Sequence, residues 1–578
     1  MPIANPAGPG RAPGPIDWIA ASVNRLTAWR AKRRASPMWT LVVALALAPL
    51  LLPIATVLWL AVAPADDALL HLVRTILPST LRDTLLMLGG VGITTLVVGT
   101  GTAWIVTMYR FPGRDVLDRL LVIPLAVPTY IVAYAWTDIL DYSGPVQSAV
   151  RALGGWSSAR EYWFFEIRSI GGAVIVLSSV LYPYVYLSAR ASFVQQSVCA
   201  LEVARTLGRT PLGAFWSVAL PMARPALAAG LALALMETLN DLGASQHLGV
   251  QTLSATIYAT WLQRSNLPGA AQIAAILLAI VVALFAAERL ARGRAQFHHT
   301  TSRYRAIPFA DLTGVKALFA GVCCLVPFTV GFAIPAAMLA ANAVSHLDDA
   351  ASGGFWRAAA SSFGLALVAA VVATALGVVL VYARRVASNG FTRPAVSLAG
   401  LGYALPGTVL ALGLLIPLAA LDNWIDGLAR AVLGVSTGLL VSGTIVVLVL
   451  VYVVRFLAVA LGSVEAGLER ISPNLDAAAR TLGETSLSAL WRVHVPMLMP
   501  ALGTAALLVF VDVMKELPAT LLLRPFNFES LATHVYALAA LEQIEAASVG
   551  ALAIVLVGLV PVLLLHQTIA GGRTGNRY

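Results

Sequence analysis

Twelve stretches of about 20 or more mainly apolar residues run through the chain, and they constrain its fold more than any other feature. A helix of about 20 apolar residues crosses the roughly 30 Å hydrocarbon core of a bilayer. Only 11% of the 578 residues are charged, whereas soluble globular proteins have about 25%. We therefore predict an all-α polytopic membrane protein with about 12 transmembrane helices. The predicted spans are 38–62, 84–108, 119–140, 170–189, 224–246, 268–287, 317–341, 359–383, 395–420, 435–459, 499–523 and 546–568.

Lysine and arginine gather on one side of these predicted spans. An even number of spans places both termini on the same side, which holds 28 of the 38 basic residues, against nine on the other side and Lys515 within a span. Because basic residues concentrate in cytoplasmic loops, we predict that both termini are cytoplasmic. The net charge of +10 then reflects this loop bias, and we expect no nucleic-acid partner.

A 27-residue segment occurs twice. Residues 201–227 and 476–502 are identical at 15 of 27 positions when one copy is shifted by 275 residues. That interval contains six predicted spans, so the sequence predicts two fused, parallel six-helix repeats with a pathway between them. The predicted parts are a cytoplasmic N-terminal tail (1–37), a first repeat (38–288), a cytoplasmic linker (289–316), a second repeat (317–568) and a cytoplasmic tail (569–578).

Each copy of this segment is predicted to form a helix–turn–helix between the fourth and fifth spans. Gly208 and Gly483 stand where a left-handed turn would end the first short helix, because glycine adopts that conformation without steric cost. The second short helix is expected to end at Pro221 or Pro496. An ordinary loop that packs two spans together is the alternative. The close match between the copies favours two equivalent partner sites.

The segment resembles the cytoplasmic loop of ATP-binding-cassette importer permeases, with its pattern E-A-A, glycine and aliphatic-x-aliphatic-Pro. In that family the loop docks onto the ATPase, so we name 201–221 and 476–496 the first and second coupling loops. The second copy has Ala477 in place of the glutamate, and Asp476 stands one residue earlier, about 100° around a helix. We therefore expect a weaker or differently placed ionic contact there. The resemblance implies coupling residues at Glu202, Ala204, Gly208, Pro221, Asp476, Ala479, Gly483 and Pro496.

The chain has no nucleotide-binding motif of its own. Its three lysines are Lys32, Lys316 and Lys515, and none follows a glycine, so the phosphate-binding loop G-x-x-x-x-G-K-[ST] is absent. We therefore predict a transport subunit without catalytic residues or a bound cofactor, and ATP on a partner chain. The resemblance implies two partners, a cytoplasmic ABC ATPase homodimer and a periplasmic substrate-binding protein, at the bacterial inner membrane.

The fifth predicted span of each repeat carries ionisable residues, which are costly inside a membrane and mark functional sites. Glu237 and Asp241 of the first repeat match Asp512 and Glu516 of the second, which also has Lys515. Spacing of i,i+4 places both carboxylates of a helix on one face. Lys515 could pair with Asp512 or, across the axis, with Asp241. Two interpretations stay open: an ion-pair lock between the halves, or a direct role in passing a cation or in gating.

Further motifs resemble fused ferric-iron permeases, and this resemblance covers nearly the whole chain after the N-terminal tail. It implies import of Fe³⁺, although related permeases carry thiamine or aminoethylphosphonate. The other classes are a proton-coupled secondary transporter that uses the four carboxylates, and a membrane-embedded assembly scaffold. No H-x-x-x-H or C-x-x-C spacing predicts a firm metal site. The motifs are Lys515–Leu521, Asn240–Ala244, Pro124–Tyr130 with Ala135–Asp138, and Tyr403–Thr408.

Overall fold

The computed structural model describes residues 37–62, 74–195, 206, 208–292, 310–346, 353–387, 389–472 and 474–571. These residues are mostly helical, and 11 helices are long and apolar enough to cross a membrane, or 12 when one bent pair counts as a single span. The prediction of an all-α polytopic protein is confirmed. Within the described residues, two strands, β1 (Tyr109–Arg110) and β2 (Ala310–Asp311), form a short parallel pair.

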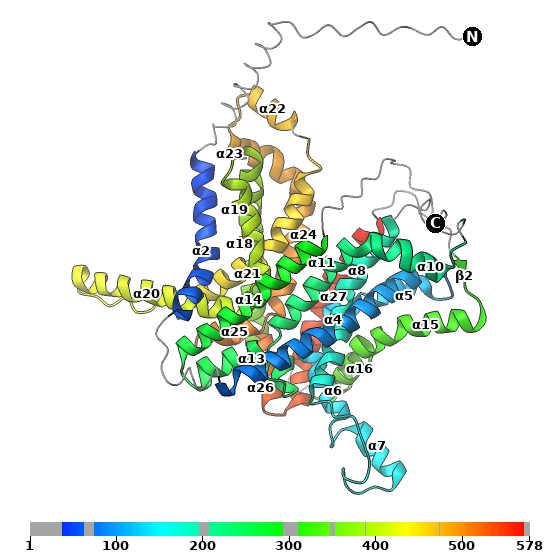
Figure 1. Ribbon diagram of the computed structural model, residues 1–578. Helices are drawn as coiled ribbons and strands as arrows, with labels where there is room; N and C mark the ends of the chain where they lie inside the picture. The colour runs from blue at the N-terminus through cyan, green and yellow to red at the C-terminus, as the bar shows by residue number, and fades with distance from the viewer. Residues whose placement is uncertain are drawn as a thin grey trace, which may run out of the picture.

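The helices of the first half are α2 (Pro37–Ala61), α4 (Leu77–Met108), α5 (Arg114–Leu120), α6 (Thr129–Leu140), α7 (Pro145–Gly154), α8 (Ile170–Gln195), α10 (Pro211–Ala214), α11 (Leu220–Asn240), α12 (Gly243–His247), α13 (Leu253–Tyr258) and α14 (Leu267–Arg292). In Figure 1 the long helices α4, α8, α11 and α14 of the first half run side by side, whereas its first helix, α2, stands upright at the edge of this group.

The second half repeats this order. Its helices are α15 (Gly314–Phe328), α16 (Ile334–Ser345), α18 (Gly353–Val386), α19 (Thr392–Ala399), α20 (Gly407–Leu433), α21 (Ile445–Leu468), α22 (Asn474–Thr481), α23 (Ser486–Ala489), α24 (Val495–Met514), α25 (Pro518–Leu523), α26 (Leu531–Ala540) and α27 (Ile544–Gly571). Some α-helices adjoin a short 3-10 helix, at Ile123–Ala126 and Gly400–Ala404. Others adjoin a π-helical turn, at Phe215–Ala219, Ala259–Gln263, Thr329–Ala333 and Leu490–His494.

The third span of each half is broken at a proline, so the prediction of continuous helices over 119–140 and 395–420 was wrong. In the first half the two parts meet at 97°. The residue before each proline is extended: Val127 has ψ 128° and Leu405 has ψ 125°. Clash with the proline ring disfavours the helical conformation at that position. Pro128 and Pro406 therefore stand at the starts of new helices, α6 and α20.

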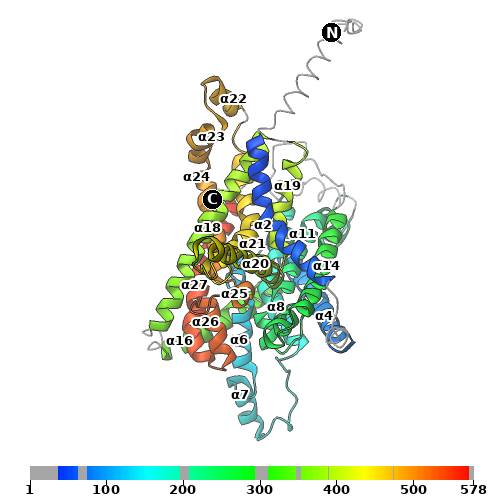
Figure 2. The same ribbon diagram turned by 90° about the vertical axis from the view of Figure 1, so that its left-hand side faces the viewer.

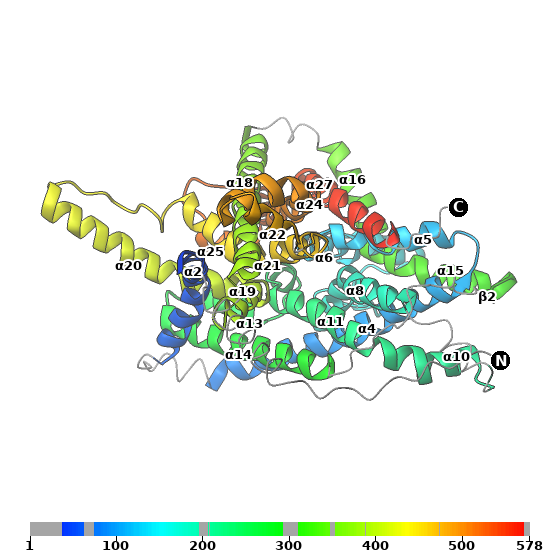
Figure 3. The same cartoon turned by 90° about the horizontal axis from the view of Figure 1, so that it is seen from above.

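The predicted span 435–459 lies about ten residues too early, because α21 covers Ile445–Leu468. Before it, an apolar segment returns along α20, and both extend away from the bundle in Figure 3. Asp422 of α20 accepts hydrogen bonds from the backbone N–H groups of Val441 and Ser442 at 2.7–3.1 Å. The returning segment is therefore held beside α20 and is not part of α21.

The first helix of each half packs on the other half. Helix α2 contacts α19 and α20, and it lies beside them in Figure 2. Helix α15 correspondingly contacts α4 and α5, and β1 pairs with β2, which shortly precedes α15. The largest apolar core contains buried residues of both halves. The two halves are consequently interlocked.

Candidate translocation pocket and coupling loops

A pocket of about 90 Å³ lies between the halves, where the third and fifth spans are broken. Its walls come from residues around Pro128 and Tyr403 and from both fifth helices. The structure brings together all the ionisable residues that the sequence places in the fifth spans. They are Glu237, Asp241, Asp512, Lys515 and Glu516.

The fifth spans are not continuous helices over 224–246 and 499–523, as the sequence predicted. Helix α11 ends at Asn240, and Asp241 leaves it with an extended backbone (ψ 127°) before α12 begins. Helix α24 ends at Met514, and α25 begins at Pro518. Irregular backbone is tolerated within a membrane only where protein or a polar cavity satisfies its polar groups, so these breaks need partners.

The carboxylates of Asp241 and Glu516, at equivalent positions of the two repeats, accept hydrogen bonds from backbone N–H groups that follow the breaks. Asp241 Oδ1 accepts hydrogen bonds from the backbone N and the Oγ of Ser245, at 2.8 and 2.9 Å. Glu516 accepts from the backbone N of Ala519 at 3.0 Å, and from the N and Oγ1 of Thr520 at 3.1 and 2.8 Å. Each carboxylate therefore caps the short helix that follows its break.

The remaining partners of these two carboxylates differ in charge. Asp241 Oδ2 accepts from Thr129 Oγ1 at 2.6 Å. Glu516 Oε1 lies 3.4 Å from Nη1 of Arg455, a residue of α21 that is only 4% exposed. The sequence prediction put Arg455 at the end of the span 435–459 and counted it among the cytoplasmic basic residues, which was wrong because α21 runs on to Leu468. The pocket thus contains a second cation besides Lys515.

Asn240 joins the two halves at this point. Its Oδ1 accepts from Arg455 Nη1 at 2.9 Å and from the backbone N of Gly407 at 2.8 Å. Gly407 leaves little room here, because a Cβ atom added to it would lie 2.6 Å from Arg455 Nη1 and 2.9 Å from Glu516 Oε1. The side-chain amide of Asn240 therefore packs closely against Arg455 and Gly407 of the second half.

Glu237 and Asp512 occupy equivalent positions with different partners. Glu237 accepts from the hydroxyl of Tyr403, in the other half, at 2.7 Å. Asp512 pairs with Lys515 on its own helix at 2.9 Å, which is one of the two partners predicted for that lysine. The ion pairs of the pocket thus lie within the second half, whereas each of these hydrogen bonds between the halves pairs a charged or polar group with a neutral partner. Tyr403 and Tyr184 also line the pocket, and sequence reasoning did not single them out as pocket residues.

The first coupling loop is only partly visible, because Glu202 and Ala204 lie outside the described residues. Gly208 and Gly483 have φ values of 79° and 83°, which confirms the predicted left-handed turns. The short second helices do not end at Pro221 and Pro496, contrary to the prediction. Both prolines instead lie in the first turn of α11 and α24, directly after a wide π turn. The backbone stays helical through each π turn, so the prolines lie inside the continuous helices Phe215–Asn240 and Ser486–Met514. A proline has no N–H to donate, which interrupts the regular hydrogen bonding of a helix at that point.

In the second coupling loop, Asp476 and Ala479 lie on α22 and face the bundle. Ala479 is buried. Asp476 bonds to Arg385 of α18 at 2.7 Å and to His494, just before α24, at 2.6 Å. Figure 1 shows α22 and α23 at one end of the second-half helices and α10 at the corresponding end of the first-half helices.

Residues 69–296 match the family described as binding-protein-dependent transport system inner membrane component. The Fe(3+)-transport system permease protein FbpB 2 of Haemophilus influenzae is 25% identical over 92% of this chain and 99% of its own length. The first half of the chain thus matches a family of importer permeases, and its similarity to a permease extends over both halves. A putative 2-aminoethylphosphonate transport system permease protein, PhnU, of Salmonella paratyphi A is 29% identical over 34% of this chain and 69% of its own. The sulfate transport system permease protein CysT of Escherichia coli is 30% identical over 32% and 65%.

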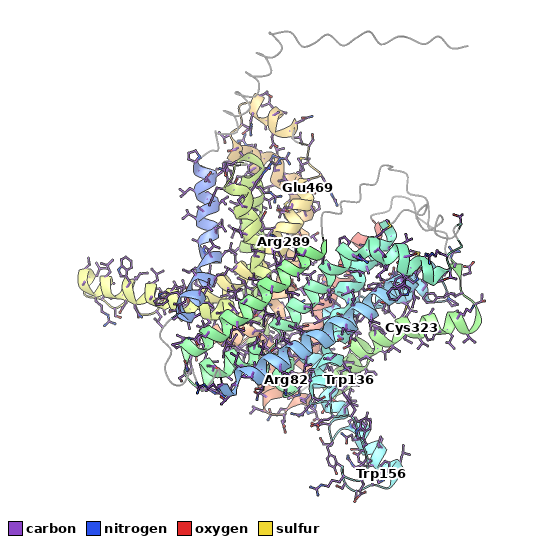
Figure 4. The ribbon with its side chains drawn as sticks, in the orientation of Figure 1. Arg82, Trp136, Trp156, Arg289, Cys323 and Glu469 are labelled. Carbon is purple, nitrogen blue, oxygen red and sulfur yellow. The ribbon has the colours of Figure 1, made fainter. Side chains whose placement is uncertain are left out.

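The permease also carries a polar arm, formed by α7 and the residues around it, far from the coupling loops. In Figure 4 its Trp156 stands at the end of a projection away from the bundle. Trp156 stacks on Tyr162 with ring centroids 5.1 Å apart. Glu161 accepts hydrogen bonds from the backbone and side chain of Ser157, which lower its pKa. This arm, residues 141–168, is thus held together by contacts among its own residues.

Proposed function

We propose that this permease moves ferric iron, delivered by a periplasmic binding protein, into the cytoplasm, with energy from a separate ABC ATPase homodimer. The main support is the relative from Haemophilus influenzae, whose similarity extends over both halves of the chain. The aminoethylphosphonate and sulfate relatives are similar over about a third of it. Both termini and both coupling loops then face the cytoplasm, in agreement with the distribution of basic residues.

The chemistry of the pocket favours a cationic cargo over an oxyanion. Four carboxylates and two cations line it, so its formal charge is negative when all six groups are ionised. Carboxylate oxygens suit hard cations, whereas sulfate or a phosphonate would meet net repulsion. The described residues contain no group of three or more His, Cys, Asp or Glu placed to hold a metal ion. We therefore propose that the pocket attracts the cargo without chelating it tightly, which allows release.

Reconstitution in proteoliposomes tests this proposal. The full permease, its ATPase and its binding protein should give uptake of Fe³⁺ that requires ATP and is insensitive to a protonophore. Uptake that follows a proton gradient without ATP would instead favour a secondary transporter. Sulfate, aminoethylphosphonate and thiamine, each presented with the same binding protein, serve as competing cargoes. ATP-dependent uptake of one of them in place of Fe³⁺ would contradict the iron assignment and leave the importer class intact.

A further inference from the structure

The carboxylate of Asp476 is used entirely within this chain. Its Oδ2 accepts a hydrogen bond from Arg385 Nε at 2.7 Å, and its Oδ1 lies 2.6 Å from His494 Nε2. The Asp476 side chain is 16% exposed and that of His494 is 0% exposed. Both oxygens therefore point toward the bundle, away from the surface where a cytoplasmic partner would bind.

Arg385 secures the site where the fourth helix of the second half ends and the coupling loop begins. Its Nη1 donates to the carbonyl oxygens of Leu468 and Ile471, each at 3.1 Å, and its Nη2 donates to the carbonyl of Ser472 at 3.1 Å. The last carbonyls of a helix lack partners within it, and a cation there also interacts favourably with the helix dipole. One guanidinium thus holds the end of α21 and, through Asp476, helix α22.

His494 links the same carboxylate to the fifth helix. It is the last residue of the π turn before α24, the helix that carries Asp512 into the pocket. Its ring also packs against Tyr382, with centroids 5.1 Å apart. Tyr382 in turn donates to the carbonyl of Ser486 in α23 at 2.8 Å. Both short helices of the loop are therefore tied to α18, and the loop is tied directly to the start of the pathway helix.

The exposed surface of the loop lies elsewhere. Leu482, between α22 and α23, is 83% exposed, and it directly precedes the left-handed Gly483. A large apolar side chain held at the tip of a structured turn is suited to a groove on a partner protein. The geometry therefore separates two roles in the loop, an outward contact at its tip and an inward attachment at Asp476.

We propose that Asp476 is a positioning residue that fixes the second coupling loop to α18 and α24, so that displacement of the loop moves the fifth helix, and that it makes no contact with the ATPase. This inference rests on the proposed function, in which an ATPase binds the loop. It also accounts for the position of the acid, one residue before Ala477. A shift of about 100° around α22 turns the carboxylate from the partner toward the bundle.

The test uses the full permease with its ATPase and binding protein in proteoliposomes. The variants are Asp476→Asn, Arg385→Gln, His494→Gln and the Asp476→Asn/Arg385→Gln double variant. Glu469→Gln, an exposed carboxylate at the end of α21, is the matched control, and Leu482→Asp probes the tip. Two quantities are measured for each: the affinity of the ATPase for the permease, and the amount of cargo carried per ATP hydrolysed.

We expect the Asp476, Arg385 and His494 variants to bind the ATPase with unchanged affinity. The amount of cargo carried per ATP should fall by about tenfold, because each variant loses a charge-assisted hydrogen bond that holds the loop to the bundle, and a bond of this kind corresponds to about a factor of ten. The loss in the double variant should be smaller than the sum of the two single losses, because both changes remove the same contact between Asp476 and Arg385. A variant that only lowers the amount of folded protein would reduce transport and hydrolysis together and leave their ratio unchanged.

Two outcomes would overturn the proposal. One is a tenfold loss of ATPase affinity in Asp476→Asn that Arg385→Gln does not share, because that would make Asp476 a contact residue. The other is a normal ratio of cargo to ATP in Asp476→Asn and His494→Gln. Failure of the proposed function itself would look different, because the wild-type permease would then not bind the ATPase. Normal ATPase binding by Leu482→Asp would contradict only the contact at the tip of the loop.

Discussion

The two broken fifth helices have the same shape but different chemistry. At both breaks a carboxylate, Asp241 or Glu516, caps the next short helix through backbone N–H groups. In the first half the remaining donor is the neutral Thr129 hydroxyl. In the second it is the buried guanidinium of Arg455. The capping by a carboxylate, which both breaks share, determines the backbone path at the break. The remaining donor, which differs, determines the local charge.

This difference shows how a fused pair of repeats departs from symmetry. Two separate but identical subunits would carry the same residue at both equivalent positions, whereas here Asn240 matches Lys515. Asn240 reaches across to Arg455 and Gly407, while Lys515 pairs with Asp512 on its own helix. Asn240 of the first half thus bridges the two halves, and the ion pairs of the pocket lie in the second half.

The largest contrast is expected between Glu516→Gln and Asp241→Asn. Glu516→Gln leaves the buried Arg455 without a counter-charge, which costs about 3–5 kcal/mol. Asp241→Asn weakens hydrogen bonds to neutral partners only, at about 1–2 kcal/mol. Thermal unfolding in detergent should therefore show a much larger drop for the first variant, with Glu469→Gln as control. Equal drops would mean that Arg455 does not distinguish the two breaks.

A second experiment removes the ion pair as a whole. Arg455→Met combined with Glu516→Gln should be less destabilising than the sum of the single changes, by about 2 kcal/mol, because no unpaired charge is then left buried. A double-mutant cycle on unfolding free energies measures this coupling. Additive effects would indicate that Glu516 acts only as a helix cap, as Asp241 does.

Asn240→Ala tests the bridge between the halves. It removes two hydrogen bonds, one of them to a charged donor, and we expect a loss of about 1–3 kcal/mol and slower ATP-driven uptake. The matched change in the other half, Lys515→Ala, leaves Asp512 unpaired but removes neither of the hydrogen bonds that Asn240 makes between the halves. Cross-linking between cysteines placed on α11 and α20 should therefore weaken only in Asn240→Ala. The same result in both variants would contradict this division of roles.

The sequence predicted the repeat, the two coupling glycines and the five ionisable residues that meet in the pocket, because each is marked by identity at a fixed offset or by charge within an apolar run. It did not identify Arg455 as a pocket residue. The returning segment before α21 contains Val435, Leu439 and Leu440, so hydropathy placed the span too early and left Arg455 near its predicted end. The packing of α2 on the second half depends on contacts between distant segments, which no local pattern encodes.

The smallest expected effects concern Glu237, whose partner is the Tyr403 hydroxyl. Tyr403→Phe removes one hydrogen bond at about 1 kcal/mol and keeps the ring, so folding and membrane insertion should be nearly normal. Glu237→Gln retains an acceptor for that hydroxyl but removes a charge from the pocket. If the carboxylate attracts the cargo, uptake should fall more in Glu237→Gln than in Tyr403→Phe, while the unfolding temperatures follow the opposite order. Normal uptake in both Glu237→Gln and Glu516→Gln would exclude a role for these acids in the pathway and leave them as structural contacts between and within the halves.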